Sequence, residues 1–111
     1  MKKIVVILSE SAQEIYSGLG KKNQMIFRSV NNKIEILKEK HVYGQAIRKK
    51  LFPKEYKAKY DITNLFRVQL SNFWRMIYTL IASESKEEII ILIIDIINHE
   101  EYNKKFGYKK K

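Results

Sequence analysis

Residues 65–82 read LFRVQLSNFWRMIYTLIA and predict a β-hairpin. In each half of this segment, apolar side chains alternate with other residues, which is the pattern of a strand with one buried face. The residues expected on the buried face are Phe66, Val68, Leu70, Trp74, Met76, Tyr78 and Leu80. Short polar residues favour tight turns, so Ser71 and Asn72 should join the two strands.

The opposite face of the hairpin carries Arg67 and Arg75. The buried faces match only if even positions pair with even positions. Two registers satisfy this condition: one places Arg75 opposite Gln69, and the other places it opposite Arg67. In both registers the two arginines are opposite or diagonal neighbours. Because two close guanidinium groups repel each other, the pattern suits either a phosphate clamp or two solvated arginines on an open sheet face.

The chain before the hairpin begins with a predicted strand and helix. Residues 4–8 are apolar and rich in β-branched side chains, which indicates a short strand. Residues 11–14, Ser-Ala-Gln-Glu, have the spacing of a capping box, so a helix should begin there. Gly18 and Gly20 should weaken or end this first helix.

A second helix is predicted over residues 22–40. It has one apolar stripe at helical spacing, formed by Ile26, Val30, Ile34 and Leu37. Gly44 follows closely and is a natural stop for a helix. The two helices, joined by a short connection, predict an αα-hairpin.

Two further segments complete the predicted fold. In residues 52–60 aromatic side chains recur every four positions, as in a helix. In residues 56–62 apolar and polar side chains also alternate, as in a strand. Of the two, we favour a short helical or irregular connector. Residues 88–97 predict a final strand that is apolar on both faces except at Asp95, as in a central strand or one covered by a partner. The predicted class is α+β, with a short strand and an αα-hairpin packed on an antiparallel sheet, in the order β-α-α-β-β-β.

Length and charge limit the domain organisation and the partners. A chain of 111 residues corresponds to one domain, expected to span residues 1–111. It has 22 Lys and Arg against 12 Asp and Glu, a net charge of +10. The excess lies in residues 44–60 and in a basic tail at about 103–111, whereas residues 83–102 are acidic. This balance makes a polyanion the first partner to consider.

Several classes of protein are excluded or disfavoured. Without Cys, the chain can form neither a disulfide scaffold nor a cysteine zinc site. It has no HExxH motif and no glycine-rich phosphate-binding motif, so we expect no metal and no cofactor. The apolar runs at residues 4–8 and 89–97 are too short for a signal peptide and a membrane-spanning helix, respectively. We therefore expect a soluble cytoplasmic protein.

The strand motifs resemble those of the RelE/ParE superfamily of toxins from type II toxin–antitoxin systems. Residues 64–70 resemble the second core strand of that family, in which basic and aliphatic residues alternate. Residues 73–78 resemble the family's aromatic-Arg-aliphatic-aliphatic-Tyr strand. His99 and Tyr102 resemble its terminal His and Tyr. The resemblance covers residues 2–102 and implies a single RelE-like domain.

The resemblance implies a metal-independent endoribonuclease that cuts mRNA at the ribosome and inhibits translation. Arg75 would stabilise the transition state, Arg67 would bind the phosphate, and both His99 and Tyr102 would transfer protons or position a base. The implied RNA-binding residues are Arg48, Lys49, Lys50, Lys57, Lys59 and Gln69. The implied partners are the ribosome, mRNA and a cognate antitoxin that is acidic or amphipathic.

Two positions depart from the family pattern. Gln69 and Glu100 stand where active members often carry basic residues, which allows a weak or lost activity. Without the resemblance, His99 reads as an exposed or hydrogen-bonded histidine and Tyr102 as a packing residue. The alternative functions are a non-catalytic nucleic-acid-binding module and a ParE-like toxin that acts on a protein target such as gyrase.

Overall fold

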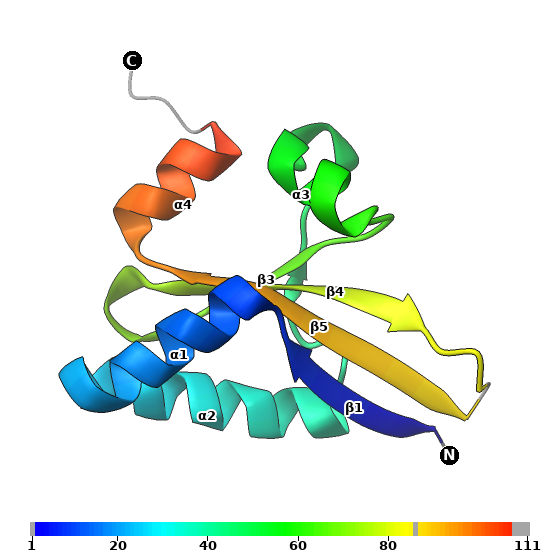
Figure 1. Ribbon diagram of the computed structural model, residues 1–111, viewed down its shortest axis with the longest axis horizontal. Coiled ribbons are helices and arrows are strands. Elements are labelled where there is room, and N and C mark those ends of the chain that lie inside the picture. Colours follow the sequence, from blue (N-terminus) through cyan, green and yellow to red (C-terminus); the bar gives the residue numbers. More distant parts are fainter. Residues whose placement is uncertain (1, 86, 108–111) are drawn as a thin grey trace.

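A five-stranded sheet with helices on both faces forms the structure (Figure 1). The computed structural model describes residues 2–85 and 87–107. The strands are β1 (Lys3–Leu8), β2 (Gln45–Ala46), β3 (Phe66–Gln69), β4 (Arg75–Ala82) and β5 (Glu88–Ile97). The helices are α1 (Glu10–Lys22), α2 (Gln24–Glu39), α3 (Lys54–Tyr60) and α4 (His99–Phe106), with a short 3₁₀ helix η1 (Lys49–Leu51).

The strand order is β1-β5-β4-β3-β2, and the predicted α+β class is confirmed. The sheet is mixed rather than purely antiparallel, because β1 joins it as an edge strand parallel to β5. Both strands run toward the same end of the sheet, where α1 and α4 begin (Figure 1). The remaining neighbours pair in antiparallel fashion.

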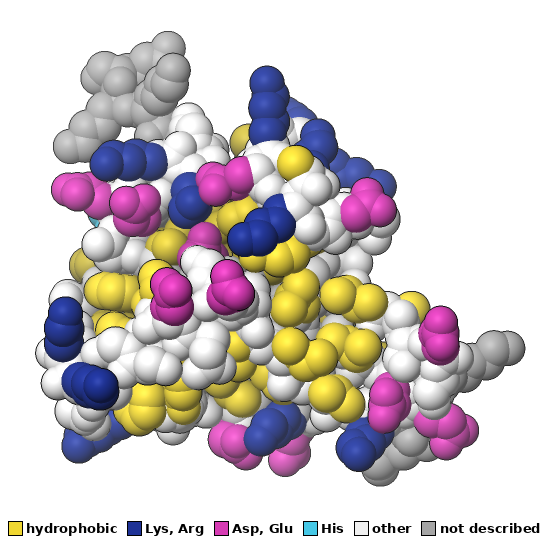
Figure 2. Space-filling view, in the orientation of Figure 1, with side chains coloured by type: hydrophobic (Ala, Val, Ile, Leu, Met, Phe, Trp, Pro, Cys, Tyr) yellow, Lys and Arg dark blue, Asp and Glu magenta, His cyan; other side chains and the backbone are white. Residues whose placement is uncertain are grey.

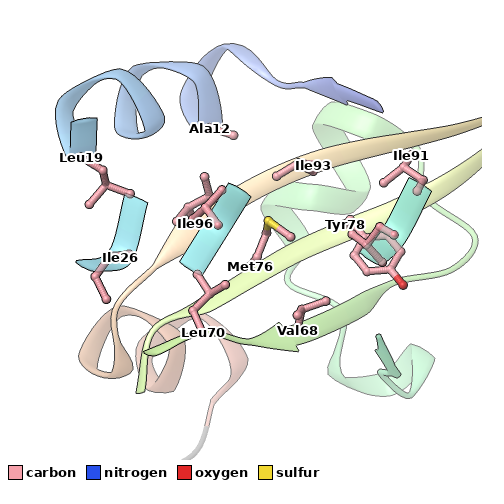
Figure 3. Close-up of a cluster of buried hydrophobic side chains, with 12 residues drawn as sticks. Ala12, Leu19, Ile26, Val68, Leu70, Met76, Tyr78, Ile91, Ile93 and Ile96 are labelled. Atoms are coloured by element: carbon pink, nitrogen blue, oxygen red, sulfur yellow. The ribbon is translucent and has the colours of Figure 1, made fainter. Parts of the chain in front are cut away.

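The first hydrophobic core lies between the sheet and helices α1 and α2. Figure 3 shows its side chains directed into the space between strands and helices. The buried residues are Ala12, Leu19, Ile26, Val30 and Leu37 from the helices and Val68, Leu70, Met76, Tyr78, Ile91, Ile93 and Ile96 from the sheet. Burial of each large side chain stabilises the fold by about 1.5–3 kcal/mol, so this core fixes the predicted αα-hairpin on the sheet.

A second core explains why β5 is apolar on both faces. Helices α3 and α4 cover the other face of the sheet (Figure 1), where Ile77, Ile94 and Ile97 are buried with Leu65, Phe52, Tyr56, Tyr102 and Phe106. The strand therefore has neighbours on both edges and helices on both faces along its C-terminal half. The face that carries the arginines is thus partly covered, and it is not an open sheet face.

The αα-hairpin differs from its prediction at its boundaries. Helix α1 begins two residues earlier than the Ser11 box suggests, because the hydroxyl of Ser9 caps it by accepting from the Ala12 N–H at 3.0 Å. Gly18 and Gly20 do not end it; the helix continues to Lys22. Asn23 then separates the helices, and its side chain caps α2.

Two segments C-terminal to the αα-hairpin also differ from expectation. The predicted connector forms the helix α3, which agrees with the favoured helical or irregular alternative. The strand alternative for residues 56–62 is wrong. The segment after β5 forms α4, which was not predicted, so residues 103–106 of the expected basic tail are helical. Residues 108–111 of that tail lie outside the described residues.

The β3–β4 hairpin adopts the first of the two predicted registers. Gln69 lies opposite Arg75, and Arg67 lies opposite Ile77, so the two arginines are diagonal neighbours. The turn between the strands contains Asn72 and Phe73, which have φ values of 55° and 64°. This register brings both guanidinium groups to one place on the sheet.

Candidate functional site

Arg67 and Arg75 both pack on the ring of Tyr102. Arg67 Nη1 donates a 2.6 Å hydrogen bond to the Tyr102 hydroxyl, and its guanidinium carbon lies 5.7 Å from the ring centroid. The guanidinium carbon of Arg75 lies 4.7 Å from the same centroid. Tyr102 is only 2 % exposed, because α4 presses it into the second core. Three of the four predicted catalytic residues are therefore in direct contact.

Gln45 on β2 holds Arg67 from the other side. Its Oε1 accepts hydrogen bonds from Arg67 Nε at 3.1 Å and Nη2 at 2.8 Å. Gln45 was not predicted from the sequence. The contact depends on β2, a strand of two residues that places Gln45 opposite Arg67 and shows too little periodicity to be recognised.

Arg75 has fewer partners than Arg67. Its Nη1 donates to the Phe73 carbonyl at 2.6 Å, and its Nε is buried with no hydrogen-bond partner among the described residues. The ion pairs found between described residues involve neither arginine. Among the described residues, neither guanidinium group is therefore paired with a carboxylate. Both are suited to bind an incoming anion.

A hollow of about 370 Å³ lies beside the two arginines. Its lining consists of Lys33, Tyr43, Gly44, Gln45, Arg67, Val68, Gln69 and Arg75. Among the described residues, three cations and three neutral polar side chains line it, but no carboxylate does. Gln69, a predicted RNA-binding residue, therefore lines this hollow, and Lys33 and Tyr43 join it from α2 and the segment that follows it. The hollow can accommodate an anionic group such as a phosphodiester.

Gly44 shapes this hollow by close packing rather than by ending a helix. Helix α2 ends at Glu39, and a Cβ at Gly44 would lie 2.7 Å from the Tyr78 ring. The Gly44 N–H donates to the Tyr78 hydroxyl at 3.0 Å, and that hydroxyl donates to the His41 carbonyl at 2.8 Å. Burial raises the pKa of Tyr78 to about 12, so this hydroxyl stays protonated as a donor.

His99 lies next to Phe73 at the start of α4. It is the first residue of α4, after the N-cap Asn98, and its side chain is exposed. Its ring centroid is 6.0 Å from that of Phe73, and its Nε2 is 3.3 Å from Asn103 Nδ2. The structure therefore relates His99 to Arg75 through Phe73, and the imidazole does not line the hollow.

The predicted RNA-binding cations divide into two groups. Arg48, Lys49 and Lys50 are exposed at η1, directly after β2. Lys57 and Lys59 are exposed on α3, but Lys59 lines a different hollow of about 110 Å³ that also contains Asp95. The structure does not bring Lys59 to the arginine pair.

A buried polar contact fixes α3 and α4 to β5. The Tyr56 hydroxyl donates to Asp95 Oδ2 at 2.7 Å, and Lys105 Nζ lies 3.8 Å from the same oxygen and 3.1 Å from Glu55. Burial, and then the charge of Asp95, raise the pKa of Tyr56. Burial also raises the pKa of Asp95, against the opposing effects of Tyr56 and Lys105. Since Lys105 is one helical turn from Tyr102, this contact helps to position the aromatic ring.

Within residues 2–85 and 87–107, no three acidic or histidine side chains are grouped so that they could hold a metal ion. In the same residues, no helix has both the length and the apolar composition needed to cross a bilayer.

Comparisons with known proteins support the fold. No protein-family model matches the sequence, and no curated protein matches it. A solved structure of the YoeB/ParE toxin from Agrobacterium tumefaciens is similar, with a TM-score of 0.61 and 15 % sequence identity. The similarity covers 89 % of this chain and 99 % of that toxin. The chain therefore has the fold of the RelE/ParE-like toxins, which confirms at the level of the fold the resemblance predicted from residues 64–78.

Proposed function

We propose that the chain is the toxin of a type II toxin–antitoxin system and that it acts as a metal-independent endoribonuclease on mRNA at the ribosome. The observation that carries this proposal is the pair Arg67 and Arg75, packed on the Tyr102 ring beside a hollow that no carboxylate of residues 2–85 or 87–107 lines. The shared fold with a YoeB/ParE toxin supports it. Two cations held on a rigid scaffold are suited to the charge that develops on a phosphate during cleavage.

In the proposed reaction, the scissile phosphate occupies the hollow. The RNA 2′-hydroxyl loses its proton and forms a bond to phosphorus while the bond to the 5′-oxygen breaks, leaving a cyclic phosphate and a 5′-hydroxyl. Arg75 stabilises the added negative charge, Arg67 binds a second phosphate oxygen, and Gln69 offers an amide donor. These groups account for binding and for charge stabilisation.

The two remaining residues take different roles in this proposal. His99 is exposed and is the candidate for proton transfer to or from the sugar oxygens. Tyr102 is a positioning residue, because its hydroxyl accepts from Arg67 and its ring lies under Arg75. The cations at η1, Arg48, Lys49 and Lys50, would hold the neighbouring RNA or ribosomal RNA backbone; Lys57 extends this surface on α3.

The proposed antitoxin would cover an apolar part of the sheet. Figure 2 shows hydrophobic side chains gathered over β1 and β5, on the part of the sheet that α3 and α4 leave uncovered. Ile7 is 45 % exposed and Ile81 is 40 % exposed, and the pairing places Leu92 and Ile90 between them. An amphipathic antitoxin segment would bury these side chains, and its acidic face would match the net charge of +10.

A second candidate function is RNA binding without catalysis. It is favoured by the position of His99 outside the hollow and by the hydrogen bond that the Tyr102 hydroxyl already accepts from Arg67. In that case the arginine pair would bind phosphate, but no group would transfer the protons.

The test is cleavage of mRNA on programmed ribosomes, with EDTA-treated toxin and primer extension to map the cuts. We expect cleavage by the wild-type chain and a loss of at least about 100-fold with Arg75→Ala. Lys38→Ala is the matched control, because it removes an exposed cation on α2 that pairs with Glu35. Cleavage that Arg75→Ala leaves unchanged would remove the assignment, and salt-sensitive RNA binding without any cleavage would favour the second candidate.

A further inference from the structure

Phe73 occupies a position that neither the turn nor the core explains. It follows Asn72 in the β3–β4 turn, and both residues have positive φ, where Gly and Asn are the favoured residue types. A bulky aromatic residue in this conformation is a genuine outlier. The side chain is 64 % exposed and belongs to neither hydrophobic core. Such strain concentrates at functional sites, so the exposed ring requires a functional explanation.

The backbone of Phe73 contacts the proposed catalytic arginine. The Phe73 carbonyl accepts the 2.6 Å hydrogen bond from Arg75 Nη1, so the backbone of this residue helps to hold the guanidinium group. The ring itself pairs with His99 in a tilted arrangement, with centroids 6.0 Å apart and an interplanar angle of 57°. In Figure 1 the turn between β3 and β4 lies beside the start of α4. An exposed aromatic pair therefore borders the arginine pair.

From this arrangement we infer that Phe73, with His99 at its edge, is a stacking platform for one unpaired nucleobase of the bound RNA; the inference rests on the proposed function. Single-stranded RNA is bound by aromatic rings that stack on bases next to cations that hold phosphates. Arg75 is two residues from Phe73. A phosphate bound by Arg75 and a base stacked on Phe73 therefore belong to one nucleotide or to adjacent nucleotides.

The surrounding charges orient this nucleotide. Glu100 and Glu101 are exposed in the first turn of α4, immediately after His99. They repel a phosphate, whereas Arg75 and Arg67 attract one. The backbone of the RNA therefore follows the arginine side of the turn, and the uncharged base lies over the ring. The same acidic turn opposes binding of an acidic protein segment at Phe73, which favours RNA as the occupant.

Equilibrium binding tests the platform without requiring cleavage. The probe is a short 2′-O-methylated RNA strand, which lacks the attacking hydroxyl, and a set of the same strand with one abasic position moved along it. We expect the wild-type chain to lose about 10-fold in affinity at one abasic position. Phe73→Leu keeps an apolar side chain but has no π face, so it should show no such loss at that position. Phe73→Trp should retain the loss.

Ile36→Ala is the control, since it removes a partly exposed apolar side chain on α2, and thermal melts of all variants check the fold. An abasic profile of Phe73→Leu equal to that of the wild type would overturn the platform, even if cleavage is observed. A Phe73-dependent profile on a chain that never cleaves RNA would retain the platform and overturn the nuclease. Binding of no strand at all would overturn both.

Discussion

At the residue scale, Tyr102 shows how one side chain organises two charges of the same sign. Its hydroxyl accepts from Arg67, and its ring lies under the guanidinium group of Arg75. A cation over an aromatic face is attracted by the ring quadrupole, which offsets part of the repulsion between the arginines. The ring and the hydroxyl therefore have separable effects.

Tyr102→Phe removes the hydroxyl and keeps the ring. We expect the free energy of unfolding to fall by about 1–2 kcal/mol, because Arg67 loses a charge-assisted hydrogen bond at a partly buried position. Tyr43→Phe is a matched control: its hydroxyl accepts from Lys33 Nζ at 3.4 Å in an exposed setting, and its loss should change stability by less than about 0.5 kcal/mol. Urea unfolding measures both, and equal effects would contradict the role given to Tyr102.

At the element scale, α3 and α4 turn one face of a sheet into a partly covered site. They are fixed to β5 through Tyr56 and Asp95 and through the second core. Because the carboxyl of Asp95 is buried, its pKa is raised in the folded protein. The folded state then binds this proton more tightly than the unfolded chain, so stability falls as pH rises from about 4 through the folded pKa.

Asp95→Asn removes this pH dependence while keeping an acceptor for Tyr56. As pH rises from 4 to 7, the unfolding free energy of Asp95→Asn should therefore increase relative to that of the wild type. Glu14→Gln, the loss of an exposed carboxylate on α1, is the matched control. Urea unfolding across this pH range measures the difference. A shift in favour of the wild type would mean that the Tyr56 and Lys105 contacts outweigh burial.

At the scale of the whole molecule, the net charge of +10 is unevenly distributed. The edge strand β2 holds Gln45 and pairs with β3 at Arg67. Directly after β2 the chain carries three cations, Arg48, Lys49 and Lys50. We propose that these exposed cations extend the proposed site along the RNA backbone. A polyanion bound there should release counterions, so its affinity should depend on salt.

The double variant Lys49→Ala/Lys50→Ala should lower the salt dependence of RNA binding. For single strands the slope of log K against log salt is about 0.7 per phosphate neutralised, so we expect its magnitude to fall by about 1.4. The matched control is Lys21→Ala/Lys22→Ala, which removes two adjacent exposed lysines from the last turn of α1. Fluorescence anisotropy at several salt concentrations gives the slopes. Equal slopes for the two double variants would exclude η1 from the RNA path.

Sequence and structure agree best where the periodicity is long and regular. The stripe of α2, the alternation of β3 and β4 and the long apolar run of β5 all lie where they were expected. Boundaries were less predictable, because Ser9 competes with Ser11 as a cap and tertiary packing carries α1 through two glycines. Helix α4 was missed because its eight residues are mostly polar, and only Tyr102 and Phe106 are buried.

The sequence by itself determined the two faces of the hairpin, the presence of both arginines on one of them and the uneven charge. These follow from side-chain alternation and from composition, which need no knowledge of distant contacts. Only the tertiary structure decided that Gln69 lies opposite Arg75, that Gln45 holds Arg67 and that Phe73 borders His99. The physical reason is that register, a two-residue strand and a helix docked from the end of the chain are set by long-range packing, which local patterns do not record.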